Sequence, residues 1–232
     1  MRTLAEMRTM TRRHLNDMST DVFSPDRIDG AIEDALNTLA YDLLAHPIGS
    51  RLLRTQTEAI SLSAGTEEYT IPEDCIKVDR VWYRESPDAK RWKAAEYRSP
   101  QPGKTPPPFY WFNGTDAVRI MIWPAMASWN EEEYKLRYFR RPKFPVSDTA
   151  TFNDPDDTGS NTDNYPAPMD RAVEYKAAAI LAGEESLAQA GIQFFEQLYQ
   201  GRVTSMVQAV PMTWPDKQYM RRAAAIERNQ ED

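Results

Sequence analysis

The sequence has little of the chemistry on which most enzyme and metal sites depend. Its 232 residues include two histidines and one cysteine, Cys75. A single cysteine excludes an internal disulfide bond and any zinc site built from several cysteines. The chain also has no glycine-rich phosphate loop, no HExxH pair and no GxSxG motif. These absences predict a protein that is not an enzyme and that carries no cofactor or metal ion.

Long apolar runs and excess positive charge are also missing. No stretch approaches the roughly 18 consecutive apolar residues of a membrane helix, and the N-terminus lacks the apolar core of a secretory signal. We therefore expect a protein made in a cytoplasm, with no membrane partner. The net charge of −7 disfavours general nucleic-acid binding, because such binding depends on clustered Lys and Arg.

What is present indicates a folded protein, since 41% hydrophobic and 27% charged residues are typical of globular chains. Thr3 and Glu6 have the spacing of a capping box at the start of a first helix. Ser24 and Pro25 form the pattern of an N-cap and a first helical residue. The second helix that begins there keeps its apolar stripe as far as His46.

After the second helix the hydrophobic period changes to two, which is typical of strands. The alternation predicts a hairpin of strands near residues 54–62 and 67–71, and a third strand, CIKVDRVWYR, that begins at Cys75. Asn113-Gly114 is a strong hairpin turn signal. Further strands are predicted at residues 109–113, 116–123 and 132–140.

The C-terminal third returns to helices after an irregular segment. Residues 147–168 have no clear period, and their 148–163 part carries several aspartates and no Lys or Arg, so we predict an exposed acidic loop. Helices are predicted over 169–209, with a break near Gly191. The tail, residues 210–232, is expected to be extended, with a short helix at 218–228.

This order of elements predicts an α+β fold. Two N-terminal helices in residues 1–50 and two C-terminal helices in residues 169–209 are expected to form one helical bundle. An antiparallel β domain, residues 51–146, is inserted into the bundle, and the extended C-terminal tail follows it.

Two short patterns suggest chemistry but are better explained as structure. Cys75 would need a histidine base, and both histidines lie in or at the ends of predicted helices, so we interpret Cys75 as a small apolar residue at the head of a strand. The segment that begins at Asp154 has the spacing of half a calcium loop. Its twelfth position, which should be glutamate, is Tyr165, so a solvated loop is favoured.

Clustered arginines and the C-terminal tail are candidates for contacts with other molecules. The arginine clusters could contact phosphate or an acidic partner subunit. The tail carries residue types that are enriched at interface hot spots, and leaving a large apolar side chain in water costs about 1.5–3 kcal/mol relative to burying it. The alternative is that the tail folds back on its own domain. The residues concerned are Arg8, Arg12, Arg13, Arg137, Arg140 and Arg141 in the clusters, and Met212, Trp214, Tyr219, Met220, Arg221 and Arg222 in the tail.

In their order and spacing, several segments resemble the head-to-tail adaptor, or head-completion, proteins of tailed bacteriophages. The resemblance runs from Leu4 to about Ala209. It is carried by LAEMRTMTRRHLND, FSPDRIDGAIEDALNTLAYDL, AGTEEYTIPEDCIKVDRVWY, TPPPFYWFNGTDAVRIMIWPAMA, YKLRYFRRPKFPVSD and MDRAVEYKAAAILA.

The resemblance implies a structural virion protein located in the neck, after assembly in the host cytoplasm. Copies of it would form a ring of about twelve beneath the portal protein, extend the DNA channel, help to retain the genome and offer a platform for the tail or nozzle protein. DNA would pass through without sequence-specific binding. We infer that the six tail residues named above bind the portal, and that Arg8, Arg12, Arg13, Arg140 and Arg141 contact neighbouring subunits or the channel. We expect the free protein to be monomeric.

Three other functions stay open. A neck protein one layer lower, for tail completion, would have the tail as its partner. A carbohydrate-binding tail module would place its site on tryptophans, and a cysteine hydrolase would depend on Cys75. The tryptophans concerned are Trp82, Trp92, Trp111 and Trp123.

Overall fold

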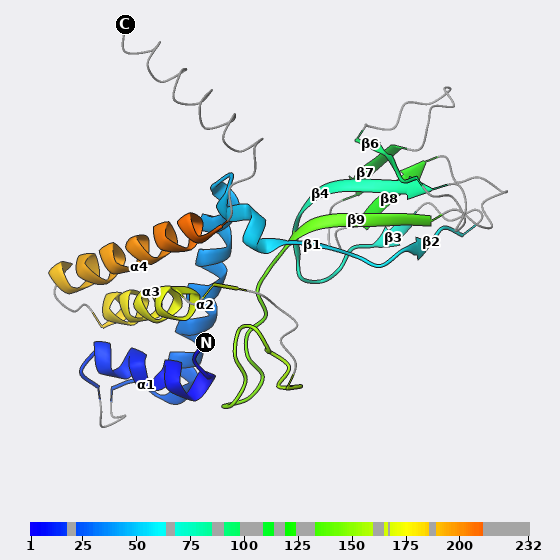
Figure 1. The fold of residues 1–232 in the computed structure, drawn as a ribbon. Coiled ribbons are helices and arrows are strands. Elements are labelled where there is room, and N and C mark those ends of the chain that lie inside the picture. Colours follow the sequence, from blue (N-terminus) through cyan, green and yellow to red (C-terminus); the bar gives the residue numbers. More distant parts are fainter. Residues whose placement is uncertain are drawn as a thin grey trace, which may run out of the picture. The chain divides into compact units, whose positions relative to one another are not determined.

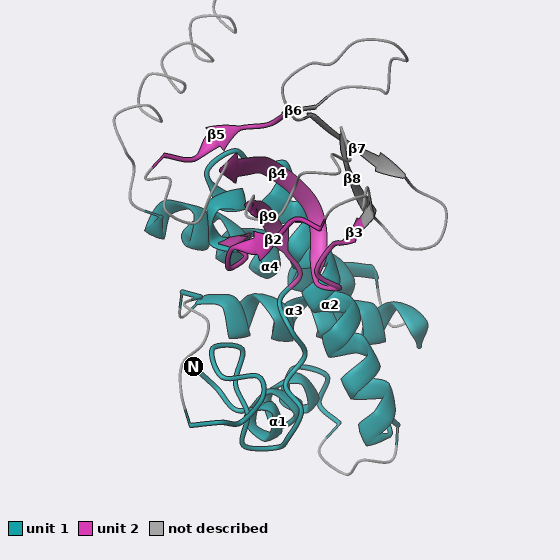
Figure 2. Cartoon of the chain, turned by 90° about the vertical axis from the view of Figure 1, so that its right-hand side faces the viewer, with its two compact units in different colours: residues 1–53, 142–232 teal, residues 54–141 magenta. Residues whose placement is uncertain are grey.

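The computed structural model of the chain consists of two compact units (Figure 1). Unit 1 comprises residues 1–53 and 142–232, and unit 2 comprises residues 54–141 (Figure 2). The predicted α+β fold class is confirmed, with four α-helices and antiparallel pairing among the described residues. The structure describes residues 1–17, 22–63, 68–84, 91–97, 109–113, 119–123, 133–159, 165–166, 168–185 and 189–210.

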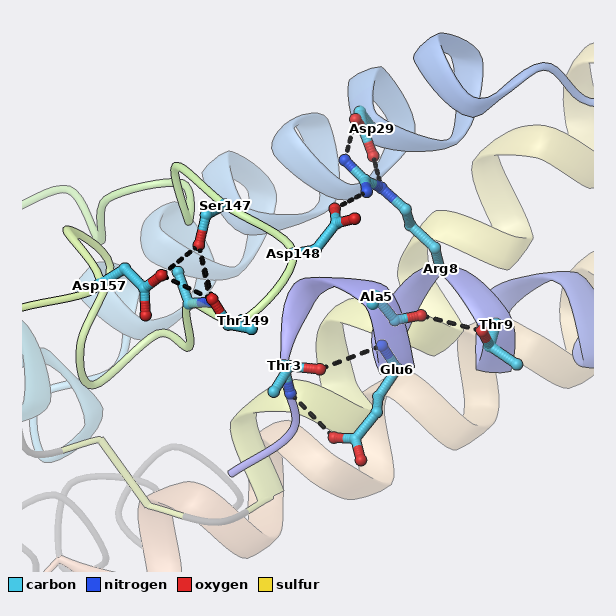
Figure 3. A network of polar contacts seen from close by, with 11 residues as sticks. Thr3, Ala5, Glu6, Arg8, Thr9, Asp29, Ser147, Asp148, Thr149 and Asp157 are labelled. Carbon is cyan, nitrogen blue, oxygen red and sulfur yellow. Dashed lines mark hydrogen bonds and ion pairs between the residues drawn. The ribbon is translucent and has the colours of Figure 1, made fainter. Parts of the chain in front are cut away.

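Unit 1 holds all the α-helices of the described residues, and the sequence signals at their starts are confirmed. Thr3 Oγ1 accepts from Glu6 N at 3.3 Å while Glu6 Oε2 accepts from Thr3 N at 2.9 Å, so the capping box is formed (Figure 3). Ser24 caps the second helix by accepting from Arg27 N. The helices are α1 (Leu4–His14), α2 (Pro25–Ala45), α3 (Pro168–Glu184) and α4 (Gln189–Ala209), with a short 3-10 helix, η1 (Gly49–Leu53), after α2.

Helix α3 is the centre of unit 1, because it packs against α4, α2 and α1. Its buried face is rich in alanine, and small side chains let neighbouring helices approach closely. Helix α4 lies beside α3 (Figure 1) but has only two buried residues, Tyr199 and Met206. The predicted break at Gly191 is wrong. Helix α3 ends at Glu184 and α4 begins at Gln189, so Gly191 lies in the first turn of α4, where glycine lowers helix propensity without ending the helix.

The predicted acidic loop is not exposed throughout. Ala150 and Phe152 are 1% and 0% exposed, so the prediction is wrong for these two residues. The carbonyl of Ala150 accepts from Leu4 N at 3.0 Å, and the carbonyl of Asp148 accepts from Ala5 N at 3.2 Å. The first amides of a helix lack partners within the helix, so this loop supplies acceptors that α1 needs.

Unit 2 contains two sheets in its described residues. In the first, β1 (Arg54–Gln56), β9 (Glu133–Arg140), β4 (Cys75–Arg84) and β5 (Lys93–Ala94) lie in that order, and β2 (Ile60–Ser61) also pairs with β9. In the second, the order is β3 (Glu68–Thr70), β8 (Arg119–Trp123), β7 (Phe109–Asn113) and β6 (Glu96–Tyr97). The β7–β8 hairpin is confirmed, while the turn after Asn113 lies outside the described residues.

Two predictions about strand pairing are wrong. Residues 54–62 and 67–71 do not form a hairpin, because β1 and β2 pair with β9 whereas β3 pairs with β8 in the other sheet. The β domain is not wholly antiparallel either, since β6 and β7 pair in parallel. Alternating hydrophobicity predicts that a segment is a strand but not which strand it pairs with. The pairing depends on the other strands of the sheet.

The core of unit 2 lies on one side of β4 and β9. Register shifts between Cys75 and Lys77 and between Val78 and Arg80 interrupt the β4–β9 ladder. An extra residue changes which face later side chains occupy, and this lets Val81 enter the core after Val78. The buried cluster consists of Leu62, Ile71, Val81, Tyr134, Leu136 and Tyr138, with Cys75 and Val78 packed against it.

Candidate functional site

Arg8 forms an ion-pair network inside unit 1. Its Nε and Nη2 atoms donate to the two carboxylate oxygens of Asp29 at 2.6 Å each, and Nη1 pairs with Asp148 (Figure 3). Hydrogen bonding to Asp29 raises the pKa of Arg8 above its ordinary value. Bidentate arginine–carboxylate pairs fix geometry as well as charge, so Arg8 ties α1 to α2 and to the loop at Asp148.

The other two N-terminal arginines differ from each other. Arg12 Nη1 lies 2.9 Å from Asp17 Oδ2, and that oxygen also accepts from Phe23 N at 3.2 Å. Arg13 is exposed, and its Nη1 lies 3.8 Å from Met10 Sδ. In the described part of the chain Arg13 has no carboxylate partner, so its charge is available to another molecule.

The arginines near the end of β9 belong to unit 2. Arg137 pairs with Asp79. Arg140 is half-buried and lies opposite Cys75 in the β4–β9 ladder. The side chain of Arg141 is exposed, and its backbone N–H donates to the carbonyl of Asp74 at 2.6 Å. The two arginine clusters of the sequence therefore lie on different units.

A groove of about 630 Å³ opens between the C-terminal ends of α2 and α4. Tyr199 is fully buried behind it and donates to Asp42 Oδ2 at 2.5 Å. Burial is the main cause that raises the pKa of Tyr199, so the phenol stays protonated as a donor. The lining residues are Asp42, Ala45, His46, Pro47, Ile48, Gln200, Val203, Thr204, Val207 and Gln208.

The described part of the chain ends at the edge of this groove. Val210 N donates to the carbonyl of Val207, which is itself a lining residue. Residues 211–232 begin directly after it, and the six predicted portal-binding residues, Met212, Trp214, Tyr219, Met220, Arg221 and Arg222, lie outside the described residues.

Asp154 organises its own loop. Its Oδ1 accepts from Thr158 N and Thr158 Oγ1 at 3.0 Å each, and its Oδ2 accepts from Gly159 N at 2.7 Å. Gly159 has φ +74°, a conformation that glycine adopts without strain. Asp154 thus closes the turn, and the described residues contain no group of three His, Cys, Asp or Glu side chains arranged to hold a metal ion.

Cys75 lies at the start of β4, as expected, and is half-buried against the core of unit 2. Burial, with a smaller contribution from Asp74, raises the pKa of its thiol to about 11. A catalytic cysteine needs a lowered pKa to supply thiolate. The environment of Cys75 acts in the opposite direction and fits a packing role.

Two of the four tryptophans named above, Trp82 in β4 and Trp92 just before β5, lie under cationic side chains. The guanidinium of Arg137 lies 4.8 Å from the Trp82 ring, and Arg84 and Lys135 each lie 4.8 Å from the Trp92 ring. Such cation–π contacts stabilise a sheet surface. The side chains of Trp111 and Trp123 lie outside the described residues.

No helix in the described ranges has both the length and the apolar character needed to cross a membrane.

Comparison with known families places the chain among the bacteriophage head-to-tail adaptor proteins. The model of one such family, described as SU10 adaptor protein, matches residues 2–225, which is nearly the whole chain. The chain belongs to this family. The resemblance found in the sequence is thereby confirmed, and the protein is a structural adaptor of a phage virion. A comparison with curated proteins finds no match.

Sequence reasoning missed several charged residues that have no partner within the described part of the chain. Glu33 and Asp34 on α2, and Arg171 and Arg202 on α3 and α4, form no ion pair there. Their helical spacing could have shown that Glu33, Asp34 and Arg171 are exposed and that Arg202 is half-buried. The absence of an internal partner appears only in the structure.

Proposed function

We propose that the protein forms a ring of twelve copies beneath the portal, extends the DNA channel, helps to retain the packaged genome and carries the tail attachment platform. The observation that carries this proposal is the family match over residues 2–225. It agrees with the architecture, in which the β unit is inserted into the sequence of the helical unit. An adaptor of this kind acts by binding, so the proposal assigns it no catalytic residue and no cofactor.

The tail, residues 210–232, is the proposed portal-binding segment. It starts at Val210, at the rim of a groove, and its sequence contains Trp214 and Tyr219, two residue types that are enriched at interface hot spots. A segment that becomes ordered on its partner couples assembly to the presence of that partner. We therefore expect a free protein that is monomeric.

The net charge of −7 suits a channel through which DNA must slide. Strong phosphate binding would retard the duplex, because each neutralised phosphate adds affinity. Of the five arginines predicted to contact neighbouring subunits or the channel, Arg13 and Arg141 are the two whose side chains are exposed.

The proposal is tested by mixing the purified protein with its portal and imaging the product by electron microscopy. A variant truncated after Ala209 and the full-length variant Trp214→Ala serve as comparisons. The full-length protein should form a ring on the portal and both variants should bind at least tenfold more weakly. Equal binding by all three would refute the tail assignment. A full-length ring bound to the tail protein and not to the portal would favour a lower position in the neck.

A further inference from the structure

Two unpaired charged surfaces of opposite sign lie on unit 1. The acidic face consists of Glu33 and Asp34 on α2, both exposed and neither in an ion pair with a described residue. The basic patch consists of Arg171 on α3 and Arg202 on α4, which line one pocket together with Arg2, Pro168 and the buried Asp170. Neither of these two arginines has a carboxylate partner in the described residues, whereas Arg2 pairs with Glu174.

The acidic face points away from the rest of unit 1. The buried stripe of α2 includes Ile32, Ala35 and Leu36, which pack toward the core. Glu33 and Asp34 are on the opposite side of the same helix turns. Tyr41, two helical turns beyond Asp34 on the same outer side, is 53% exposed.

The basic patch points in another direction. Gln200 of α4 lines the groove that α4 shares with α2. Arg202 follows Gln200 by two residues, so it projects about 160° away from it around the helix axis. Arg202 therefore faces away from α2, and the two surfaces cannot neutralise each other within one copy.

We propose that the acidic face of one copy docks on the basic patch of the next copy and forms the contact between neighbouring subunits of the ring. This inference rests on the proposed function. It commits to a second copy as the partner, because the same chain carries both complementary surfaces. A contact between two different surfaces of identical subunits is heterologous, and repetition of such a contact closes into a ring when the rotation fits.

The charged pairs define the register of the contact. Arginine can bind a carboxylate through two parallel hydrogen bonds, and its planar guanidinium also stacks on a ring such as that of Tyr41. Complementary charge mainly sets orientation and association rate, while like charges facing each other oppose the contact. Reversal of either surface should therefore prevent assembly, and reversal of both should restore it.

The test uses full-length protein, its portal and electron microscopy of the fraction of portals that carry a complete ring. The variants are Glu33→Lys/Asp34→Lys, Arg171→Glu/Arg202→Glu and the combination of all four substitutions. Each reversed surface alone should lower ring occupancy at least tenfold. The fourfold variant should return within about twofold of wild type. An equimolar mixture of the two double variants should also assemble, because every contact in an alternating ring then joins opposite charges.

The matched control is Glu58→Lys/Glu73→Lys, which changes net charge equally but alters two exposed acids of unit 2. It should assemble like wild type. Thermal unfolding monitors the fold of each variant. A charge-reversed variant that unfolds at a lower temperature than wild type is replaced by the neutral variant Glu33→Gln/Asp34→Asn or Arg171→Gln/Arg202→Gln. These neutral variants should also lower the fraction of portals that carry a complete ring. Normal rings from either reversed double variant, or failure of both the fourfold variant and the mixture, would overturn the inference. A wild-type protein that leaves the portal bare would refute the proposed function and this inference together.

Discussion

Gly49 should be intolerant of a side chain, whereas Gly30 should accept one. A Cβ atom at Gly49 would lie 3.1 Å from the carbonyl oxygen of Leu43 and 3.1 Å from Val207 Cγ2. Backbone cannot move aside as a flexible side chain can, so Gly49→Ala should lower the free energy of unfolding by about 1–3 kcal/mol through overpacking. At Gly30, inside α2, nothing lies within 4 Å of the added Cβ. Gly30→Ala should raise that free energy by about 0.5–1 kcal/mol.

The two alanine variants are compared by urea unfolding of the full chain, followed by the helical circular dichroism signal. This signal reports unit 1, which holds the described α-helices. The two variants should differ by about 1.5–4 kcal/mol in opposite directions from wild type. Equal stability of the two variants, or stabilisation by Gly49→Ala, would refute the close packing of η1 against Leu43 and Val207 beside the groove.

Three further predictions concern buried polar groups. Because the pKa of Cys75 is raised to about 11, folded protein at pH 8 should react with iodoacetamide at least tenfold more slowly than protein unfolded in urea. The free energy of unfolding should also fall as pH rises from about 9 toward 11, because the unfolded thiol loses its proton first. Rapid labelling of the folded form would contradict the burial. Arg2→Ala should lower the free energy of unfolding by about 3 kcal/mol, because it leaves the Glu174 side chain, which is 1% exposed, without the Arg2 guanidinium. The double variant Arg2→Ala/Glu174→Gln should recover part of this loss. An unchanged urea midpoint for Arg2→Ala would show that the pair contributes nothing to stability. Tyr199→Phe should cost about 1.5–3 kcal/mol, since a hydrogen bond to the Asp42 carboxylate is lost, and a thermal melt equal to that of wild type would argue against this bond.

Local signals in the sequence predicted local structure well. The capping box of Thr3 and Glu6 and the N-cap at Ser24 formed as expected, because each involves groups only three residues apart. The start of β4 at Cys75 was likewise predictable from alternation. The class of protein followed from the order of such segments.

Long-range pairing could not be predicted in the same way. The strand at 68–70 alternates as a hairpin partner would, yet it pairs with β8, which is distant in the sequence. Arg8 belongs to an arginine cluster in the sequence, but its guanidinium forms ion pairs with Asp29 and Asp148, which lie in other segments of the chain. Phe152 is fully buried although it lies in a loop whose polar composition predicted exposure.

The central claim is that copies of this chain bind the portal as a ring. Electron microscopy of the portal mixed with the full-length protein tests it most directly. The account predicts one closed ring, coaxial with the portal, in the presence of full-length protein, and at least tenfold weaker binding by the variant truncated after Ala209. A portal that stays bare at saturating full-length protein would contradict the account.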